Sequence, residues 1–249
     1  MTRPSRFFCI LSVFLALLLQ ISGSAQDLSK LFTANDYFNF EFVSDPQIAP
    51  DGKRILYVRN FADPMTDQTY SNIWIIGFDG GGNRPLTSGL HHDASPRWSP
   101  DGTQFIFISD REGKPQIYKY WLDLGQSAVL TNLLFPPMEP SWSPDGKQIG
   151  YFSVVPFMPR TIASPVPAPP GAQLAAPPKV IYRLMYRFDG IGYIPGFLQV
   201  FIIPSEGGTP RQLTSGDFNH PDFYSREICW SPDGRSIFIS ANKIGRAHV

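Results

Sequence analysis

Two short clusters of histidine and aspartate contain the residue types in this chain that could bind a metal. His91-His92-Asp93 and His220-Pro221-Asp222 each follow a Leu-Thr pair at similar places in the sequence. A zinc site needs three or four such side chains converging on one point. The sequence does not show that either cluster converges on one point, so we interpret both as solvated loops between blades, and we expect no metal and no cofactor.

Nucleophilic chemistry has equally few candidates. Hydrolases of the α/β class hold their serine in a Gly-x-Ser-x-Gly turn, and this pattern occurs nowhere in the 249 residues. Cys229 stands beside Trp230 in an apolar run, so we expect a packed core thiol. Gly80-Gly81-Gly82 lies between two expected strands, which favours a strand turn over a phosphate cradle. We therefore predict no catalytic residue and no enzymatic activity for this chain alone.

A basic and aromatic stretch offers the candidates for substrate contact. The segment KVIYRLMYRFDGIGY follows a proline-rich tract at 154–178, and its candidate residues are Arg183, Tyr186, Arg187 and Asp189. One interpretation is a finger that touches a peptide substrate. The alternative is an additional hairpin, with Asp189-Gly190 as its turn, packed on the edge of a sheet. The sequence leaves both open.

A sequence repeat predicts the structural elements that must position these residues. Trp-Ser-Pro-Asp-Gly occurs at 98–102, 142–146 and 230–234, and a related Ala-Pro-Asp-Gly occurs at 49–52. The spacings between copies are 50, 44 and 88 residues, and the last is twice 44. A period in the forties indicates an array of similar structural units.

Each copy of the repeat has a physical role. Proline presets φ for the second position of a type I turn, aspartate bonds nearby backbone, and glycine takes the left-handed conformation that starts the next strand. Tryptophan supplies a rigid surface that can pack on a neighbouring unit. We assign these structural roles, and no role as acid or ligand, to Trp98, Pro100, Asp101, Gly102, Trp142, Pro144, Asp145, Gly146, Trp230, Pro232, Asp233 and Gly234.

Alternating strands follow every turn, as in KRILYVR (53–59) and TQFIFIS (103–109). A second pair of strands ending in Leu-Thr follows in three copies, at 72–87, 116–131 and 199–214. Four antiparallel strands per 44 residues match one blade of a β-propeller. We predict an all-β chain, a partial β-propeller over 26–243 that is incomplete at the C-terminus, with a blade insertion at 154–198.

The two ends of the chain are expected to lie outside that domain. Residues 1–25 have the layout of a secretory signal, with two arginines before an apolar run of about 13 residues. Residues 244–249 abandon the repeat, and we interpret them as a non-native tail. The expected location is therefore periplasmic or secreted, without a membrane anchor after cleavage. The formal net charge is +0, which argues against a nucleic-acid partner.

The repeats and their flanks resemble one protein family. The segments LFTANDYFNFEFVSDPQIAPDGKRILYVR (31–59), SPRWSPDGTQFIFISDREGKPQIY (95–118), RLMYRFDGIGY (183–193) and GGTPRQLTSGDFNHPDF (207–223) are similar to the amino-terminal propeller of the prolyl oligopeptidase family of serine peptidases. The similarity is greatest to the acylaminoacyl-peptidase and dipeptidyl-peptidase-like branch. The repeat itself is of the TolB type, which many propellers share.

Two functions are consistent with that resemblance. The first is the substrate-gating propeller of an exported serine peptidase whose α/β-hydrolase domain, absent from this chain, would cleave peptide substrates. The second is a non-enzymatic, periplasmic, TolB-like propeller that binds a protein. The sequence does not indicate the substrate preference, the number of blades or the oligomeric state.

Overall fold

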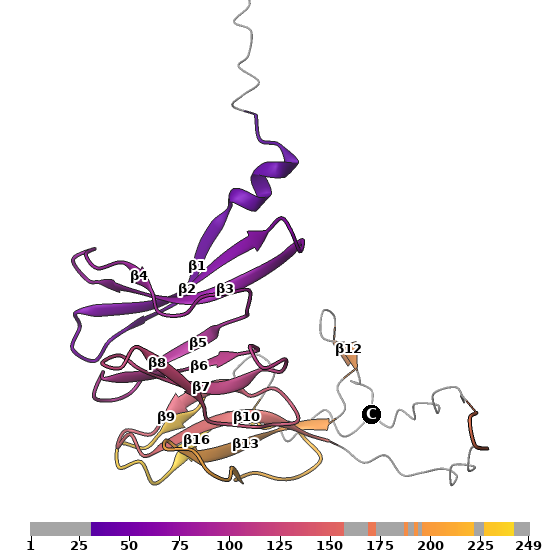
Figure 1. The fold of residues 1–249 in the computed structure, drawn as a ribbon. Helices are drawn as coiled ribbons and strands as arrows, with labels where there is room; N and C mark the ends of the chain where they lie inside the picture. The colour runs from indigo at the N-terminus through magenta and orange to yellow at the C-terminus, as the bar shows by residue number, and fades with distance from the viewer. Residues whose placement is uncertain are drawn as a thin grey trace, which may run out of the picture. The chain divides into compact units, whose positions relative to one another are not determined.

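The computed structural model describes residues 31–156, 169–172, 187–188, 192–193, 196–221 and 227–241. Its chain divides into two compact units, residues 1–39 and 40–249. The described part of the first unit contains one short 3₁₀ helix, η2 (Ala34–Asn39). All strands belong to the second unit, in agreement with the predicted all-β class (Figure 1).

Three four-stranded antiparallel sheets follow one another along the chain, and we call them blades 1 to 3. Blade 1 consists of β1 (Glu41–Ile48), β2 (Arg54–Asp63), β3 (Gln68–Gly77) and β4 (Arg84–Pro85). Blade 2 consists of β5 (Ala94–Trp98), β6 (Gln104–Ser109), β7 (Gln116–Trp121) and β8 (Gln126–Val129). Blade 3 consists of β9 (Met138–Trp142), β10 (Gln148–Pro156), β13 (Gly196–Pro204) and β14 (Arg211–Gln212). The predicted blade architecture is therefore confirmed.

Two smaller sheets complete the described strands. β15 (Cys229–Trp230) pairs with β16 (Ile237–Phe238), and we call this pair blade 4. β11 (Arg187–Phe188) pairs with β12 (Gly192–Tyr193) between the two middle strands of blade 3. The pairing of β10 with β13 continues to Pro156 and Gly196. The described pairing of β10 with β13 therefore reaches to within two residues of each end of the expected insertion at 154–198.

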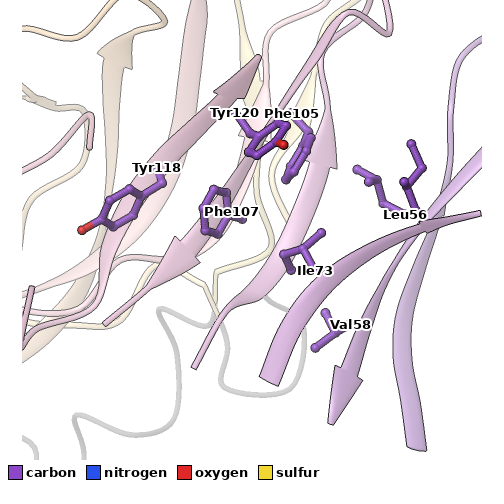
Figure 2. Close-up of a cluster of buried hydrophobic side chains, with 8 residues drawn as sticks. Leu56, Val58, Ile73, Phe105, Phe107, Tyr118 and Tyr120 are labelled. Carbon is purple, nitrogen blue, oxygen red and sulfur yellow. The ribbon is translucent and has the colours of Figure 1, made fainter. Parts of the chain in front are cut away.

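The core lies between blades because strand alternation gives every middle strand two apolar faces. Between blades 1 and 2, aliphatic side chains of β2 and β3 meet aromatic side chains of β6 and β7, as Figure 2 shows. The residues are Leu56, Val58, Ile73, Ile75, Phe105, Phe107, Tyr118 and Tyr120. Each buried side chain of this size contributes about 1.5–3 kcal/mol through the hydrophobic effect.

The opposite face of blade 2 packs on blade 3 in the same way. This cluster consists of Ile106, Ile117, Trp142, Ile149, Tyr151 and Ile203. A third cluster joins blade 3 to blade 4, and it consists of Phe152, Leu198, Val200 and Ile228. Successive blades are thus joined face to face by side chains from strands that are far apart in the sequence.

One sequence expectation about the core is wrong. Cys229 was expected to be a packed thiol, but it is exposed. Its neighbour Ile228 is the buried residue, and it packs on blade 3. Alternation along a strand sends adjacent side chains to opposite faces, so an apolar residue beside a buried one need not be buried.

Candidate functional site

The predicted turns occur as expected at every copy of the repeat. In blade 2 the amide of Gly102 donates to the carbonyl of Ser99 at 2.9 Å, and Gly102 has φ of 68°. The Ser99 hydroxyl donates to Asp101 Oδ1 at 2.6 Å, and the Thr103 amide donates to the same oxygen at 3.1 Å. Asp101 therefore satisfies donors on both sides of its own turn, which is a structural role.

The same hydrogen bonds recur in blades 3 and 4. Ser143 Oγ donates to Asp145 Oδ1 and Ser231 Oγ donates to Asp233 Oδ1, both at 2.6 Å. These serine hydrogen bonds, followed by backbone donors, hold the pKa of each turn aspartate below its usual value. All three carboxylates are consequently ionised acceptors at neutral pH, unsuited to donate a proton.

Two of the three repeated tryptophans, Trp98 and Trp142, link blades through their indole nitrogens. Trp98 Nε1 donates to the carbonyl of Gln47 in blade 1 at 2.9 Å. One blade further on, Trp142 Nε1 donates to the carbonyl of Arg97 at 3.0 Å. In each case the acceptor directly precedes the residue that corresponds to the tryptophan in the preceding repeat: Gln47 precedes Ile48, and Arg97 precedes Trp98. The predicted packing of tryptophan on a neighbouring unit is confirmed at these two positions.

The Leu-Thr pairs close the outer strand of each blade. Thr87, Thr131 and Thr214 accept at Oγ1 from a backbone amide of the adjacent strand, at 2.8, 3.0 and 2.9 Å. In blades 2 and 3 the same hydroxyls donate to Gln116 and Gln199, at 2.8 Å in both cases. This recurrence explains why the pair is repeated in the sequence.

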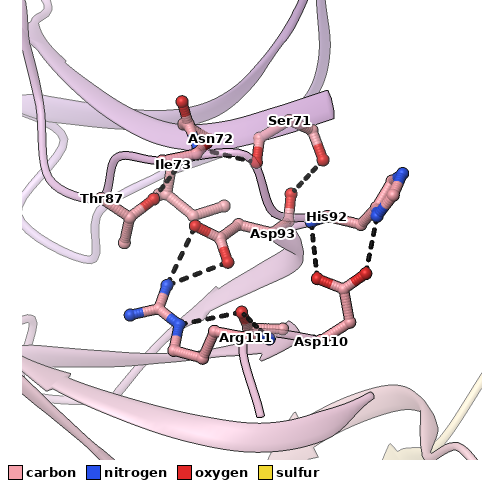
Figure 3. Close-up of polar contacts among 10 residues, drawn as sticks. Ser71, Asn72, Ile73, Thr87, His92, Asp93, Asp110 and Arg111 are labelled. Carbon is pink, nitrogen blue, oxygen red and sulfur yellow. Dashed lines mark hydrogen bonds and ion pairs between the residues drawn. The ribbon is translucent and has the colours of Figure 1, made fainter. Parts of the chain in front are cut away.

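The first histidine cluster forms a clasp between blades 1 and 2, shown in Figure 3. Consecutive residues His92 and Asp93 pair with consecutive residues Asp110 and Arg111. His92 Nδ1 lies 2.6 Å from Asp110 Oδ2, and Arg111 Nη2 donates to both oxygens of Asp93 at 2.9 and 3.1 Å. The Asp93 side chain is 0% exposed, so its charge requires this partner.

Neither histidine cluster forms a metal site in the described part of the chain. No group of three or more histidine, cysteine, aspartate or glutamate side chains lies there in an arrangement that could hold an ion.

Burial acts to raise the pKa of Asp110, but hydrogen bonds from His92 outweigh it and lower that pKa. His220 is buried, and its amide donates to the carbonyl of Leu198. Asp93 and His220 were expected to be solvated and are instead buried parts of inter-blade connections.

The candidates for substrate contact mostly lie outside the described residues. This holds for Arg183, Tyr186 and Asp189, so their role stays a prediction. Arg187 belongs to β11, of which only the backbone is described. β11 pairs antiparallel with β12, and both interpretations of this segment stay predictions.

The innermost strands carry a polar row that the sequence analysis missed. β1, β5 and β9 are each first in their sheet, and each contacts the next. At the same position they contain Asp45-Pro46-Gln47, Ser95-Pro96-Arg97 and Glu139-Pro140-Ser141. The pattern is a polar residue, a proline and a second polar residue, directly before Ile48, Trp98 and Trp142. This triplet preceding each turn was the signal available in the sequence.

The backbone of this row is unusual in the same way three times. Asp45, Ser95 and Glu139 have φ of 46°, 53° and 48°, and they are three of the four non-glycine residues with positive φ in the described chain. In β1, β5 and β9 the pairing register shifts at this position. Such backbone is uncommon for residues other than glycine, asparagine and aspartate, so its repetition indicates a constraint on what these strands present.

Charges connect the row across the three blades. Arg97 Nη1 donates to Asp45 Oδ2 at 2.7 Å, and Arg97 Nη2 lies 3.6 Å from Glu139 Oε2. Gln47 Nε2 donates to the other oxygen of Asp45 at 2.7 Å. Asp45 is therefore held firmly, whereas Glu139, with a side chain 42% exposed, is held loosely. We call Asp45, Gln47, Ser95, Arg97, Glu139 and Ser141 the inner row.

Comparison with known proteins identifies the domain. Residues 37–155 match the family model described as the TolB beta propeller domain. The chain is 36% identical over 238 residues to the "Uncharacterized peptidase YuxL" of Bacillus subtilis, covering 86% of this chain and 32% of that protein. It is 45% identical over 58 residues to the "Tol-Pal system protein TolB" of Bordetella pertussis, covering 23% of this chain and 13% of that protein.

Solved structures agree on the fold. The acylaminoacyl peptidase of Pyrococcus horikoshii superposes with a TM-score of 0.57 at 18% identity, covering 78% of this chain and 27% of that one. This chain therefore spans about a third or less of the length of the peptidases that it matches. Within the described residues, no helix has the length and apolar character needed to cross a bilayer.

Proposed function

This chain carries a TolB-type β-propeller of the kind found in prolyl oligopeptidase-type peptidases, and from that premise we propose that it is the substrate-gating part of an exported serine peptidase. The observation that carries the proposal is the 36% identity to a peptidase over 238 residues. That similarity extends beyond the residues 37–155 of the general propeller model.

In this proposal the chain supplies selection and a separate catalytic region supplies the reaction. Hydrolysis would proceed by acyl transfer to a serine, with a histidine as base and an oxyanion hole. None of those groups is assigned to this chain, because it has no Gly-x-Ser-x-Gly turn. In this proposal the blades would admit short or unfolded peptides and exclude folded proteins.

A second candidate is a TolB-like propeller that binds a protein partner without hydrolysis. The 45% identity to a TolB protein over 58 residues favours this alternative locally. The two candidates differ in one chemical property, which is the presence of a reactive serine in the complete gene product.

The test is to express the gene from its natural start to its natural stop and to treat the product with a fluorophosphonate, which reacts with activated serines. The proposal expects covalent labelling and cleavage of chromogenic peptides by that product. The 249-residue chain serves as the matched control, and it should show neither. A full-length product that is unlabelled but captures a folded protein would replace the proposal by the TolB-like alternative.

Export is tested separately. A fusion of residues 1–25 to a reporter enzyme that is active only outside the cytoplasm should give activity, with cleavage after Ala25. A reporter retained in the cytoplasm would contradict the location while leaving the peptidase assignment intact.

A further inference from the structure

The inner row has the features of a surface that contacts a peptide through side chains. β1, β5 and β9 each pair with only one neighbour in their sheet, so the unpaired backbone edge of each strand could accept another strand. Pro46, Pro96 and Pro140 remove one amide donor from each of these edges. The register shifts in β1, β5 and β9 disrupt the edge as well. A peptide passing this edge therefore meets side chains instead of a continuous ladder of backbone donors and acceptors.

Those side chains are suited to an extended polar segment. Gln47, Ser95 and Ser141 contribute an amide and two hydroxyls, and all three residues are partly exposed. Ser95 occupies the first polar position of its triplet, and Gln47 and Ser141 occupy the second, on strands that contact one another in order. Each of the three blades thus presents a partly exposed hydrogen-bonding side chain at or beside the proline of its first strand.

The charge of the row is not balanced. It contains two carboxylates, Asp45 and Glu139, and one guanidinium, Arg97, which gives one net negative charge. Arg97 is committed to Asp45 at 2.7 Å and to the carbonyl of Pro96 at 2.8 Å. The 3.6 Å contact leaves Glu139 as the member whose charge is least neutralised. The nearby pair of Arg59 with Glu41 adds no net charge.

We propose that the inner row binds extended peptide segments and favours those that carry lysine or arginine, with Glu139 as the residue that determines this preference. The inference rests on the proposed peptidase function and names the charge of its substrate. Arg97 reaches Glu139 only at 3.6 Å, so the largely unneutralised carboxylate of Glu139 is expected to attract a cationic side chain of a bound peptide.

The experiment measures peptide binding to the full 249-residue chain, immobilised at low density so that copies cannot associate. Two decapeptides of glycine, serine and alanine are used as probes, identical except for one central lysine or one central glutamate. Surface plasmon resonance at low salt should give about threefold to fivefold tighter binding of the lysine peptide, the size expected for one exposed charge pair. Raising the salt to about 0.3 M should reduce this ratio, because the pair is screened.

Three variants locate the effect. Glu139→Gln should bring the ratio close to one, and Glu139→Asp should retain most of it. Asp79→Asn makes the same change of charge in the exposed turn between β3 and β4, and it should leave the ratio unchanged. Circular dichroism of each variant verifies that the blades remain folded.

The outcomes separate the two proposals. Equal binding of both peptides by the wild-type chain would overturn the charge preference and leave peptide gating in place. A ratio that persists in Glu139→Gln, or that falls equally in Asp79→Asn, would overturn the assignment to the inner row. Binding of neither peptide would contradict the proposed gating function itself, and the inference would fall with it.

Discussion

The seam between blades 1 and 2 and the seam between blades 2 and 3 have the same plan but different charges. Both have an apolar cluster and one tryptophan nitrogen bonded across the seam. The first seam adds a fully buried carboxylate, Asp93, paired with Arg111. The second adds a buried cation, Lys119, which is 1% exposed and lies 3.0 Å from Glu206.

The two ion pairs differ in the environment of the charged group that remains when its partner is removed. Lys119 Nζ also donates to the carbonyl of Ser205 at 2.8 Å, and its partner Glu206 is 81% exposed. If Lys119 is removed, Glu206 stays solvated, whereas removal of Arg111 leaves Asp93 buried and charged. The cost of breaking a pair depends on the group left behind more than on the pair itself. The following predictions test this difference.

The largest effect is expected for Arg111→Met. This change leaves the Asp93 carboxylate without its cation and should lower the free energy of unfolding by about 3 kcal/mol. Urea denaturation followed by tryptophan fluorescence measures it. Arg111→Lys is the control, because it retains the charge and should recover much of the loss. A loss of unfolding free energy below about 1 kcal/mol would show that another group or water solvates the Asp93 carboxylate in the variant.

A smaller effect is expected for Lys119→Met in the second seam. The methionine fills a similar volume, and the main loss is one hydrogen bond to the Ser205 carbonyl, about 1–2 kcal/mol. Glu206→Gln, which removes the exposed partner alone, should cost less than about 1 kcal/mol. If Lys119→Met proved as damaging as Arg111→Met, the comparison between the seams would be wrong.

The tryptophan links should respond equally in both seams. Trp98→Phe and Trp142→Phe each remove one indole donor and some buried area, at a cost of about 1–2 kcal/mol. The two variants should agree within about 0.5 kcal/mol in the same urea assay. A large inequality would show that the repeated motif does not make equivalent contacts.

The smallest effect is expected in a repeated turn. Asp101→Ala removes the acceptor for Ser99 and Thr103 and should cost about 0.5–1 kcal/mol at pH 7. Hydrogen bonds from Ser99 and Thr103 hold the folded-state pKa of Asp101 below its usual value of 3.8, so its contribution is complete above that pH and is lost as the pH falls through the folded pKa. The difference between wild type and variant should therefore shrink below about pH 4. A difference that stays constant to pH 2.5 would argue against an ionised acceptor.

Particular residues show which parts of the fold are predictable. The turn at Ser99–Gly102 follows from four adjacent residues whose conformational preferences agree, so its geometry was read correctly from the sequence. Strand alternation likewise predicted the blades. It did not predict the exposure of Cys229 or the burial of Asp93, because burial depends on what a neighbouring blade presents.

The inner row was missed for a related reason. The triplet Ser95-Pro96-Arg97 is visible in the sequence, but nothing local distinguishes it from a loop. The partner of Arg97 is Asp45, 52 residues earlier, and the two meet only because β1 and β5 lie next to each other. A charge pair of this kind is a property of the blade arrangement.

The sequence by itself determined the repeating unit: where each turn lies, which strands follow and that the units are blades. Those features depend on backbone preferences and side-chain alternation, which act over a few residues. The tertiary structure alone decided which side chains meet between units. These contacts are the ion pair of Arg111 with Asp93, the hydrogen bond from Lys119 to the Ser205 carbonyl, and the pairing of Arg97 with Asp45 and Glu139. Contacts of this kind are set by the packing of one sheet on the next, and the physical reason is that packing brings together residues that local interactions never relate.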